Sequence, residues 1–391
     1  MISKVSVTNF KNHAQTEIEL GRVTALVGPN GCGKTSLLQS TYYLGQLADQ
    51  TVERVFSRER DPSHLVRQGC ESFTVTLHGQ QPSATAEQQP SATKWKTSVI
   101  YTKPSQSTRN LHIEFEWQWD NEESHRADLI MGETLANAKP NHFIIRVLKQ
   151  IIYFKAMMVN LSAPSYSEQT LPQIAPDGSG LASAAAYLMT AERERHQEVE
   201  AALRTIVPTV KRVRAKPAKV TLHERKIFSV NETRVPIDEQ REVTGQELIF
   251  DTIDADGLPA HVMSDGTLLA LGLLTALWSP ASPQLILLDD VEQGLHPLAQ
   301  RRLMHTLKEF AEKQDRQIIL TSHSPYIVDE LEAKDVWVMA TDPSGVSQVK
   351  RLSDHPDAKR LLSVLTTGEF VGAVGEDWVV GDAAPAEEVN A

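Results

Sequence analysis

The sequence predicts an α/β fold in which a mixed sheet core carries an antiparallel β subdomain and an inserted helical lobe. Three observations lead to this prediction. The apolar run VTALV at 23–27 enters a glycine-rich stretch at 28–36, and leucines at helical spacing follow. The first twenty residues alternate apolar and polar side chains, as half-buried strands do. The C-terminal third alternates strand and helix patterns, which indicates a parallel sheet covered on both faces.

The individual elements are predicted from these patterns in chain order. Strands are expected at 2–9, 15–20 and 23–27, and a helix from 34 to 48. The middle of the chain is expected to hold strands at 72–77, 97–102 and 111–119, helices at 141–158 and 180–206, and strands at 218–230 and 247–252. The last third is expected to hold a helix at 264–278, a strand at 285–290, a helix at 297–313 and a strand at 317–321.

Length and composition are those of a globular protein. The 391 residues suffice for one large α/β domain with insertions or for two average domains. A formal net charge of -11 argues against non-specific coating of nucleic acid and leaves room only for a local basic groove. No signal peptide or long apolar segment is visible, so we expect a cytosolic protein with no membrane contact. The two cysteines, Cys32 and Cys70, are too few for a disulfide framework and are expected to be thiols.

The domain layout follows from the element order. We expect one domain with its core at 1–48 and 246–345, an inserted β and helical lobe at 49–245, and a C-terminal part at 346–391 that ends in a loose tail. Within the insertion the hexapeptide QQPSAT occurs twice. Such residues bury too little apolar surface to offset the entropy of ordering, so 79–93 is expected to be a mobile hairpin tip.

The stretch GPNGCGKTS at 28–36 fits the phosphate-binding pattern G-x-x-x-x-G-K-[ST]. Its glycines let consecutive N–H groups face phosphates, Lys34 neutralises the β and γ oxygens, and Thr35 offers a hydroxyl to Mg²⁺. The alternative is a glycine-rich turn that fits the pattern by chance. It is disfavoured because the stretch follows a predicted strand and precedes a predicted helix, as a phosphate-binding loop does. ATP or GTP with Mg²⁺ is therefore expected here, bound by Asn30, Gly31, Cys32, Gly33, Lys34, Thr35 and Ser36. The apolar strand LILLDD then delivers Asp289 to the metal and a second acid to the attacking water.

Several stretches resemble the motifs of ABC-type ATPases. MSDGTL is similar to their signature motif, LILLDDVEQGLHP to their Walker B strand and LTSHSPYIVD to their switch-histidine loop. The opening ISKVSVTNFKN and LVGPNGCGKTSLL are similar to the RecF, SMC and OLD branch. The stretches APSYSEQTLPQIAPDGSGLAS and GEFVGAVGEDWV also resemble small ATPases found beside effectors in bacterial defence loci, such as PtuA of Septu. The motif likeness covers 1–48 and 260–331.

The resemblance implies a P-loop NTPase of the ABC-ATPase type that binds ATP and holds only half of a site. Ser264 and Gly266 of a second copy would close the nucleotide on one P-loop, so a homodimer or higher even oligomer is expected. A second interpretation is that Ser264 only caps an apolar helix. His323 matches the γ-phosphate sensor, and no glutamine of the Q-loop can be assigned among Gln150, Gln169 and Gln173.

The catalytic base is the main departure from the family pattern. Asp290 stands where the family has glutamate and is one methylene shorter, which predicts slow ATP hydrolysis because proton transfer needs hydrogen-bond reach. Glu292 is the alternative base, or else an exposed loop acid. Lys11 and Asn12 lie in the corner that approaches nucleotide in the family, although a solvated charge explains Lys11 equally well. The basic run at 211–219 is compatible with DNA contact, but a solvated face is the favoured interpretation.

The leading functional hypothesis is an ATP-gated switch in anti-phage defence or DNA maintenance. The chain ends soon after His323, so we expect the switch to act on a separately encoded effector protein, a nuclease. Direct binding of DNA by this chain is an open alternative. An importer ATPase is disfavoured because the signature lies far beyond the P-loop. A GTPase or kinase is disfavoured because no NKxD motif is present. A non-hydrolysing ATP-bound scaffold stays open because of Asp290.

Overall fold

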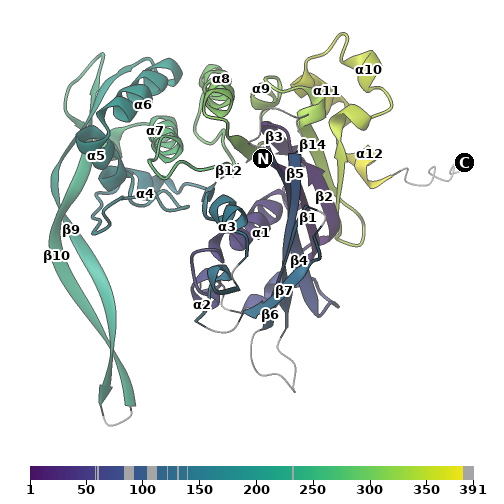
Figure 1. Cartoon of the computed structure of the whole chain (residues 1–391). Helices are drawn as coiled ribbons and strands as arrows, with labels where there is room; N and C mark the ends of the chain where they lie inside the picture. Colours follow the sequence, from purple (N-terminus) through teal and green to yellow (C-terminus); the bar gives the residue numbers. More distant parts are fainter. Residues whose placement is uncertain are drawn as a thin grey trace, which may run out of the picture. The chain divides into compact units, whose positions relative to one another are not determined.

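The computed structural model describes residues 1–57, 59, 61–82, 92–103, 112–120, 122–129, 132–138, 140–230 and 233–381 (Figure 1). The chain divides into two compact units. Unit 1 comprises Met1–Tyr153, Pro283–Glu292 and Met304–Ala391, and unit 2 comprises Phe154–Ser282 and Gln293–Leu303. Among the described residues, no helix has the length and apolar character needed to cross a membrane.

Unit 1 contains a mostly parallel sheet with the strand order β15-β14-β3-β13-β12-β8. These strands are β3 (Val23–Val27), β8 (Ile151–Phe154), β12 (Leu285–Leu288), β13 (Gln317–Thr321), β14 (Val336–Thr341) and β15 (Ser347–Arg351). Strands β12, β13, β3 and β14 pair in parallel, and β15 joins β14 as an antiparallel edge. Every residue of β3, β12 and β13 is buried, as expected of central parallel strands.

A second, antiparallel sheet in unit 1 has the order β2-β1-β4-β5-β6-β7. Its strands are β1 (Ile2–Phe10), β2 (His13–Glu19), β4 (Ser72–Pro82), β5 (Ala92–Thr102), β6 (His112–Trp119) and β7 (His125–Leu129). Helices α1 (Lys34–Gln46), α2 (Val52–Val55) and α3 (His142–Lys149) lie along one face of this sheet (Figure 1). Helix α1 contacts strands of both sheets, and its leucines belong to one hydrophobic core with them. This packing fixes the end of α1 that begins at the glycine-rich loop.

The C-terminal part of unit 1 is built from short helices. They are α9 (Pro325–Val328), α10 (Ala358–Leu361), α11 (Thr367–Val374) and α12 (Asp377–Val380), and helix α8 (Pro297–Lys313) enters unit 1 at Met304. Helix α11 begins with a capping box between Thr366 and Glu369. Single 3-10 turns lie at Pro62–Leu65, Leu135–Ala138, Ala260–Val262, Ala333–Asp335 and Leu352–Asp354.

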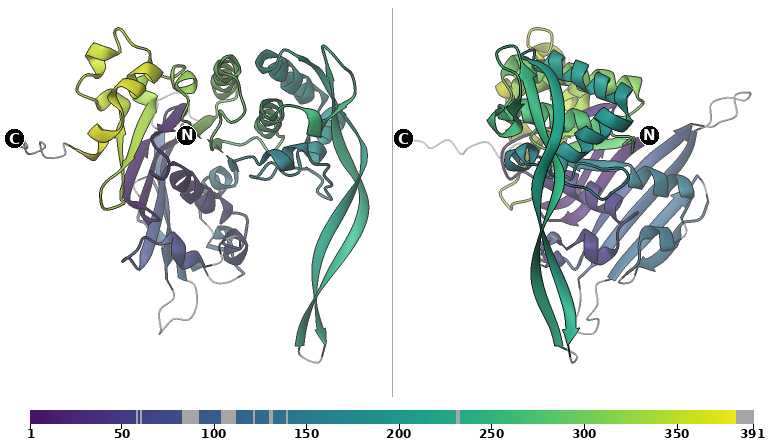
Figure 2. Two further views of the ribbon diagram at one scale, coloured as in Figure 1. Left: turned by 180° about the vertical axis from the view of Figure 1, so that it is seen from behind. Right: turned by 90° about the vertical axis from the view of Figure 1, so that its left-hand side faces the viewer.

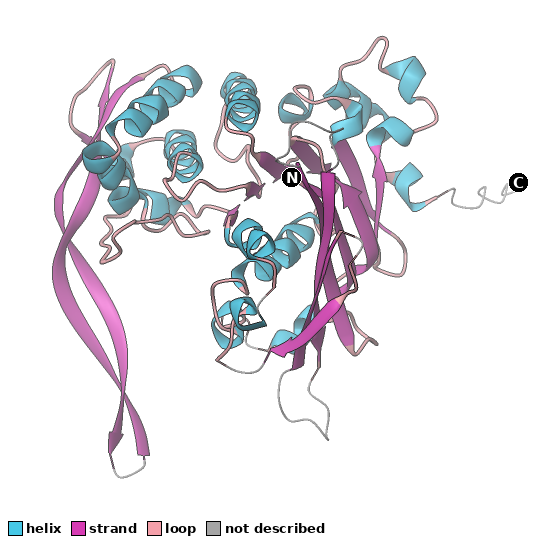
Figure 3. Ribbon diagram, in the orientation of Figure 1, coloured by secondary structure: helices cyan, strands magenta, loops and turns pink. Residues whose placement is uncertain are grey.

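In the described part of the chain, unit 2 combines four complete helices with a long two-stranded ribbon, coloured as strand in Figure 3. The helices are α4 (Met158–Ser162), α5 (Leu181–Ala191), α6 (Arg193–Ile206) and α7 (Asp265–Leu277). Every residue of α7 from Gly266 to Leu277 is buried, and α7 packs on the other three helices. Strands β9 (Val210–Val230) and β10 (Thr233–Thr252) pair antiparallel along almost their whole length, and β11 (Leu258–Pro259) joins β10. The ribbon is twisted and extends away from the helices of its unit (Figure 2).

The structure corrects four of the predicted elements. The helix expected at 141–158 ends at Lys149, and Ile151–Phe154 forms strand β8 at the edge of the parallel sheet, where β-branched and aromatic residues fit well. The helix expected at 180–206 breaks at Glu192, whose backbone leaves the helical region. The strands expected at 218–230 and 247–252 extend into one ribbon.

Two predictions of mobility fall largely beyond the part of the chain that is described. Residues 79–82 and 92–93 belong to β4 and β5, whereas 83–91 lie outside the described residues. The expected loose tail lies outside them from residue 382 onward.

Candidate nucleotide-binding site

The glycine-rich loop requires glycine at two positions for steric reasons. Gly28 has φ 143 and Gly33 has φ 106, which side-chain-bearing residues rarely adopt. A Cβ on Gly28 would overlap the carbonyl of Met339, and a Cβ on Gly33 would lie 2.5 Å from Ser347 Oγ. The loop backbone is therefore packed closely against β14, β15 and the His13 side chain of β2.

Side chains outside the loop hold three of its carbonyl groups. The Gly33 carbonyl is 3.0 Å from His13 Nε2, Asn12 Nδ2 donates to the Gly31 carbonyl at 3.0 Å, and Ser347 Oγ donates to the Cys32 carbonyl at 2.6 Å. Fixing carbonyls from outside lets a loop of this type present N–H groups inward to an anion. The sequence predicted that Asn12 approaches the nucleotide, and the structure shows its amide supporting the loop. His13 and Ser347 were missed.

His13 is a neutral buried support. It is fully buried, and its Nδ1 is 2.8 Å from Thr16 Oγ1. Burial lowers the pKa of His13 to about 4, although its contact with the Gly33 carbonyl acts in the opposite direction. The neutral ring therefore donates from Nε2 to the loop and accepts from the Thr16 hydroxyl at Nδ1. The only sequence signal is its position directly after the corner that contains Lys11 and Asn12.

The two lysines of the region lie in different surroundings. Lys34 is buried, and its Nζ donates to the carbonyls of Gly28 at 2.7 Å and Pro29 at 2.9 Å. Lys11 Nζ donates to Gln39 Oε1 at 2.8 Å, and burial lowers the pKa of Lys11 while Glu59 acts to raise it. Lys11 is thus a half-buried, bonded cation and not a freely solvated charge.

Asp289 is the convergence point of three hydroxyl groups. Its Oδ1 accepts from Thr35 Oγ1 at 3.0 Å and from Thr321 Oγ1 at 2.7 Å, and its Oδ2 accepts from Tyr153 Oη at 2.9 Å. The carboxylate is buried at the end of β12, beside the first turn of α1. A threonine hydroxyl and a carboxylate are oxygen donors of the kind that Mg²⁺ takes together with water and phosphate. Thr35 and Asp289 therefore fit the predicted metal, and their role as ligands stays a prediction.

Tyr153 is the main residue that sequence reasoning missed. Burial first, and then the Asp289 charge, raise the pKa of its phenol, so the hydroxyl stays a donor. Gln150 lies at the opposite end of β8, where its carbonyl accepts from Gln284 N at 2.8 Å, and Gln169 and Gln173 belong to unit 2. Tyr153 lay inside the segment predicted as helix. The run Ile-Ile-Tyr-Phe after a helix end was the available signal for a strand.

The two candidate bases have different surroundings. Asp290 has φ 56, in the left-handed region, and its backbone N–H donates to Thr321 Oγ1 at 2.8 Å. Glu292 Oε1 accepts from the backbone N–H of His323 at 2.7 Å, and its Oε2 is buried with no partner in the part of the chain that is described. Glu292 is therefore tied to the histidine loop, which differs from the exposed loop acid that the sequence favoured. The His323 side chain is exposed.

Three segments of unit 1 line a pocket of about 300 Å³. It is lined by Gly28 of the loop, by His323 and Ser324 after β13, and by Gly372 and Gly375 in and after α11. The GEFVGAVGEDWV segment therefore borders the same pocket as the predicted γ-phosphate sensor.

In unit 2 the signature stretch forms the start of helix α7. Ser264 is the N-cap, with its Oγ 2.8 Å from Thr267 Oγ1 and accepting from Thr267 N at 3.4 Å. A Cβ on Gly266 would lie 2.5 Å from the Gly294 carbonyl, so the first turn packs tightly on that loop. Ser264 thus caps a helix, as the second interpretation expected. The same position lies at an N-terminus that favours anions, so capping and nucleotide binding are compatible.

Comparisons with known proteins agree with this geometry. Residues 105–329, more than half of the chain, match the family described as "AAA domain, putative AbiEii toxin, Type IV TA system". The chain belongs to this family. Residues 1–52 match a second model, described as "AAA ATPase domain". The prediction that the chain is a member of the AAA family of ATPase domains is confirmed.

Two curated relatives of this AAA domain are DNA replication and repair proteins RecF. Identity is 42% over 52 residues with the protein of Paenarthrobacter aurescens (strain TC1), where the match spans 13% of each chain. It is 37% over 81 residues with that of Streptomyces avermitilis, where the match spans 20% of each chain. The matched segments are thus a small part of either relative.

Solved SMC heads share the fold of the AAA domain. The SmcHead bound to the C-winged helix domain of ScpA has a TM-score of 0.54 at 14% identity, covering 92% of this chain and 99% of that one. An Smc head domain with an extended coiled coil, bound to the C-terminal domain of ScpA derived from Pyrococcus furiosus, has a TM-score of 0.51 at 12% identity over 93% of this chain and 99% of that one. These likenesses confirm the predicted fold class.

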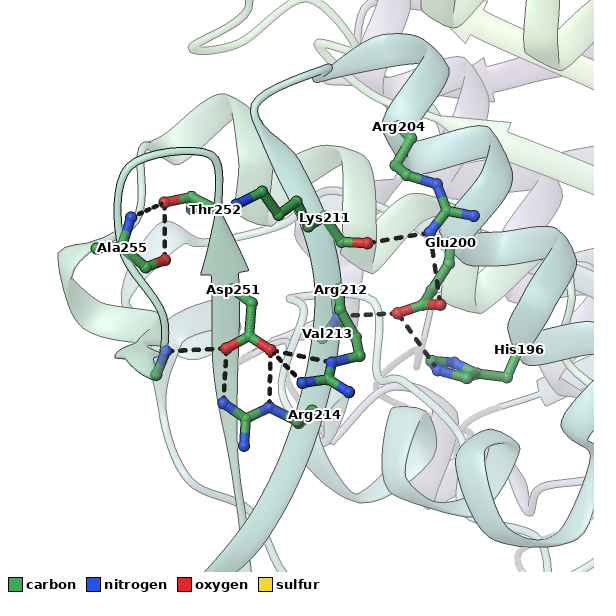
Figure 4. A network of polar contacts seen from close by, with 11 residues as sticks. His196, Glu200, Arg204, Lys211, Arg212, Val213, Arg214, Asp251, Thr252 and Ala255 are labelled. Carbon is green, nitrogen blue, oxygen red and sulfur yellow. Dashed lines mark hydrogen bonds and ion pairs between the residues drawn. The ribbon is translucent and has the colours of Figure 1, made fainter.

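The basic run of this AAA domain at 211–219 is paired with acids on the neighbouring strand. Arg212 and Arg214 both form ion pairs with Asp251, at closest distances of 2.8 and 2.6 Å (Figure 4). These hydrogen bonds hold the pKa of the Asp251 carboxyl well below its usual range, and the bond from Arg214 has the larger effect. Two further pairs lie along the ribbon, Lys216 with Glu247 at 2.6 Å and Lys219 with Glu242 at 3.1 Å. These contacts favour an ion-paired face over a free cationic surface for DNA.

Proposed function

We propose that this AAA domain binds ATP with Mg²⁺, hydrolyses the ATP slowly and works as an ATP-gated switch. The observation that carries the proposal is the meeting of the glycine-rich loop, Thr35 and Asp289 at the carboxyl end of a parallel sheet. This is the edge at which such sheets bind ligands. The N-terminus of α1 adds a favourable field for phosphate oxygens.

Each residue then has a distinct task. Lys34 exchanges its carbonyl partners for phosphate oxygens, and the loop N–H groups bind the rest of the phosphate chain. Thr35 and Asp289 would hold Mg²⁺, which neutralises charge on the β and γ oxygens when bound. Asp290 orients and deprotonates the attacking water. Glu292 is the alternative base, because its buried Oε2 has no hydrogen-bond partner among the described residues and is a free acceptor for a proton. His323 senses the γ-phosphate from the adjoining pocket.

The direct test is equilibrium binding of ATP to the wild-type chain and to Lys34→Ala. The substitution removes the cation that faces the triphosphate, so ATP binding should be lost while the circular dichroism spectrum stays that of the folded chain. Equal affinity of the two proteins would contradict the assignment of the loop.

We further infer that ATP closes two copies head to tail. Ser264 and Gly266 of one copy would complete the site formed by Lys34 and Asp289 of its partner, since the N-terminus of α7 is a second anion-favouring helix end. Light scattering with and without Mg²⁺ and ATP tests this directly. A mass that does not depend on nucleotide would count against closure, and a stable ATP-bound complex without turnover would favour the scaffold hypothesis.

The switch is proposed to act on a separately encoded effector, a nuclease, in anti-phage defence or DNA maintenance. Two solved heads with this fold are bound to domains of another protein, ScpA, and two relatives are named for DNA replication and repair. The pocket shared by His323 and the α11 segment supports a docking site that responds to nucleotide. A useful response needs a coupling free energy of roughly 1–3 kcal/mol between ATP and effector.

A further inference from the structure

Tyr153 and the two threonines bind different oxygens of Asp289. Thr35 and Thr321 both donate to Oδ1, whereas the phenol of Tyr153 donates to Oδ2 at 2.9 Å. The carboxylate is thereby fixed in rotation, with one oxygen toward the glycine-rich loop and the other toward β8. Loss of the phenol bond would free the carboxylate to turn about its last torsion angle, which is intrinsically broad.

The ring of Tyr153 is itself held in place. It is half-buried, and it packs against Tyr42 of helix α1 with ring centroids 5.4 Å apart. Strand β8 neighbours β12 in the sheet, so the phenol extends across one strand spacing to the end of β12. The hydroxyl therefore has a defined position relative to the helix that follows the phosphate-binding loop.

The next residue, Phe154, is buried within unit 2. Successive side chains of a strand point to opposite faces, so neighbouring residues can contact different parts of the protein. The Phe154 ring lies 3.2 Å from the position that a Cβ on Gly272 would take, in the middle of helix α7. The backbone beyond is bonded as well, from Lys155 N to the Pro176 carbonyl at 2.8 Å and from Met157 N to the Asp177 carbonyl at 2.9 Å. One peptide bond thus joins a residue on the metal carboxylate to a residue seated against the signature helix.

We propose that Tyr153 is a positioning residue that orients Asp289 for the metal and transmits the state of this carboxylate through Phe154 to helix α7. The inference rests on the proposed binding of ATP with Mg²⁺. Metal binding draws the Asp289 oxygens toward the cation, and the phenol must follow or lose its bond. Because Phe154 packs beside Leu161 over Gly272, a shift of Phe154 displaces a side chain that is closely packed against α7.

The first experiment is a titration with Mn²⁺, a paramagnetic substitute for Mg²⁺, followed by electron paramagnetic resonance in the presence of ATP. Tyr153→Phe keeps the ring and removes the hydroxyl, and it should weaken Mn²⁺ binding by about tenfold, the usual effect of losing a hydrogen bond to a metal-binding side chain. Binding of ATP without metal should be unchanged. Tyr187→Phe in helix α5 is the matched control and should bind Mn²⁺ as the wild-type chain does. Equal Mn²⁺ affinity in Tyr153→Phe overturns the inference.

The second experiment is hydrogen exchange over residues 154–162 and 265–277, with and without Mn²⁺ and ATP at saturating concentrations. The wild-type chain should gain protection in both segments, and Tyr153→Phe should not. Phe154→Leu should keep wild-type Mn²⁺ affinity and lose the response in 265–277, which separates orientation of the carboxylate from transmission. Undiminished protection in both variants overturns transmission. A wild-type chain that binds neither ATP nor Mn²⁺ would instead refute the proposed function itself.

Discussion

At the scale of single residues, the candidate site is held by side chains that lie outside the glycine-rich loop. His13, Asn12 and Ser347 each bind a carbonyl of the glycine-rich loop. Ser347 and Cys32 are 315 residues apart in the sequence, so no local sequence pattern predicts their contact. Lys34, Thr35 and Asp289 could be predicted because each lies inside a short sequence motif whose neighbouring residues identify it. The side chains that bind the loop carbonyls can be identified only from the folded structure.

The buried His13 predicts a pH dependence of stability. Its pKa is about 4 in the folded chain and about 6.5 when unfolded, so the unfolded chain binds the extra proton between these values. Stability should be fully present above about pH 6.5 and fall as the pH drops, by about 2 kcal/mol between about pH 7 and pH 5. Urea unfolding of the wild-type chain and of His13→Gln at both pH values isolates this contribution. Parallel losses in the two proteins would show that His13 does not carry it.

The two acids after Asp289 predict different kinetic effects. If Asp290 is the base, Asp290→Asn should lower ATP turnover by about 100-fold or more while ATP binding is retained, since only proton transfer is lost. Glu292→Gln should lower turnover less, through the backbone of His323 that it holds. Single-turnover hydrolysis separates chemistry from binding. Loss of turnover in Glu292→Gln, with Asp290→Asn active, would transfer the role of base to Glu292.

At the scale of elements, burial decides which sequence predictions succeed. The expected helix at 264–278 is α7 (Asp265–Leu277), because its apolar residues are too numerous for any exposed segment. The expected helix at 141–158 is wrong after Lys149, since Ile-Ile-Tyr-Phe suits a buried helix face and a buried strand equally well. The segment becomes a strand because it lies beside the edge of β12, and β12 is formed by residues far along the chain. Tyr153 was missed with the strand that carries it.

Two helical glycines allow a matched test of element packing. A Cβ on Gly272 would lie 2.7 Å from Leu161 and 3.2 Å from Phe154, whereas a Cβ on Gly372 in α11 would meet nothing within 4 Å. Gly272→Ala should therefore lower the free energy of unfolding by about 1–3 kcal/mol through overpacking. Gly372→Ala should raise it by about 0.5–1 kcal/mol through helix propensity. Urea denaturation measures both, and destabilisation by Gly372→Ala alone would contradict the packing described for α7.

At the scale of the whole molecule, the proposed head-to-tail closure assigns two different parts of a nucleotide site to each chain. Unit 1 contains the loop, Thr35 and Asp289, and unit 2 contains the capped N-terminus of α7. Closure between two copies would make the function of each part depend on the other chain. Substitutions in the two parts should therefore behave differently when they lie on the same chain and on different chains.

Mixed dimers test this dependence directly. Chains with Ser264→Arg retain the loop, and chains with Lys34→Ala retain the signature serine, so a dimer of one of each has one complete site and should recover up to half of wild-type turnover. The control carries both substitutions on one chain and is paired with wild type. That dimer has the same composition but no complete site, since the intact loop faces a signature helix without its serine and the intact serine faces a loop without its lysine. Two affinity tags purify each mixed dimer away from the homodimers. Equal turnover of the two mixed dimers would refute head-to-tail closure, because composition alone would then set the activity.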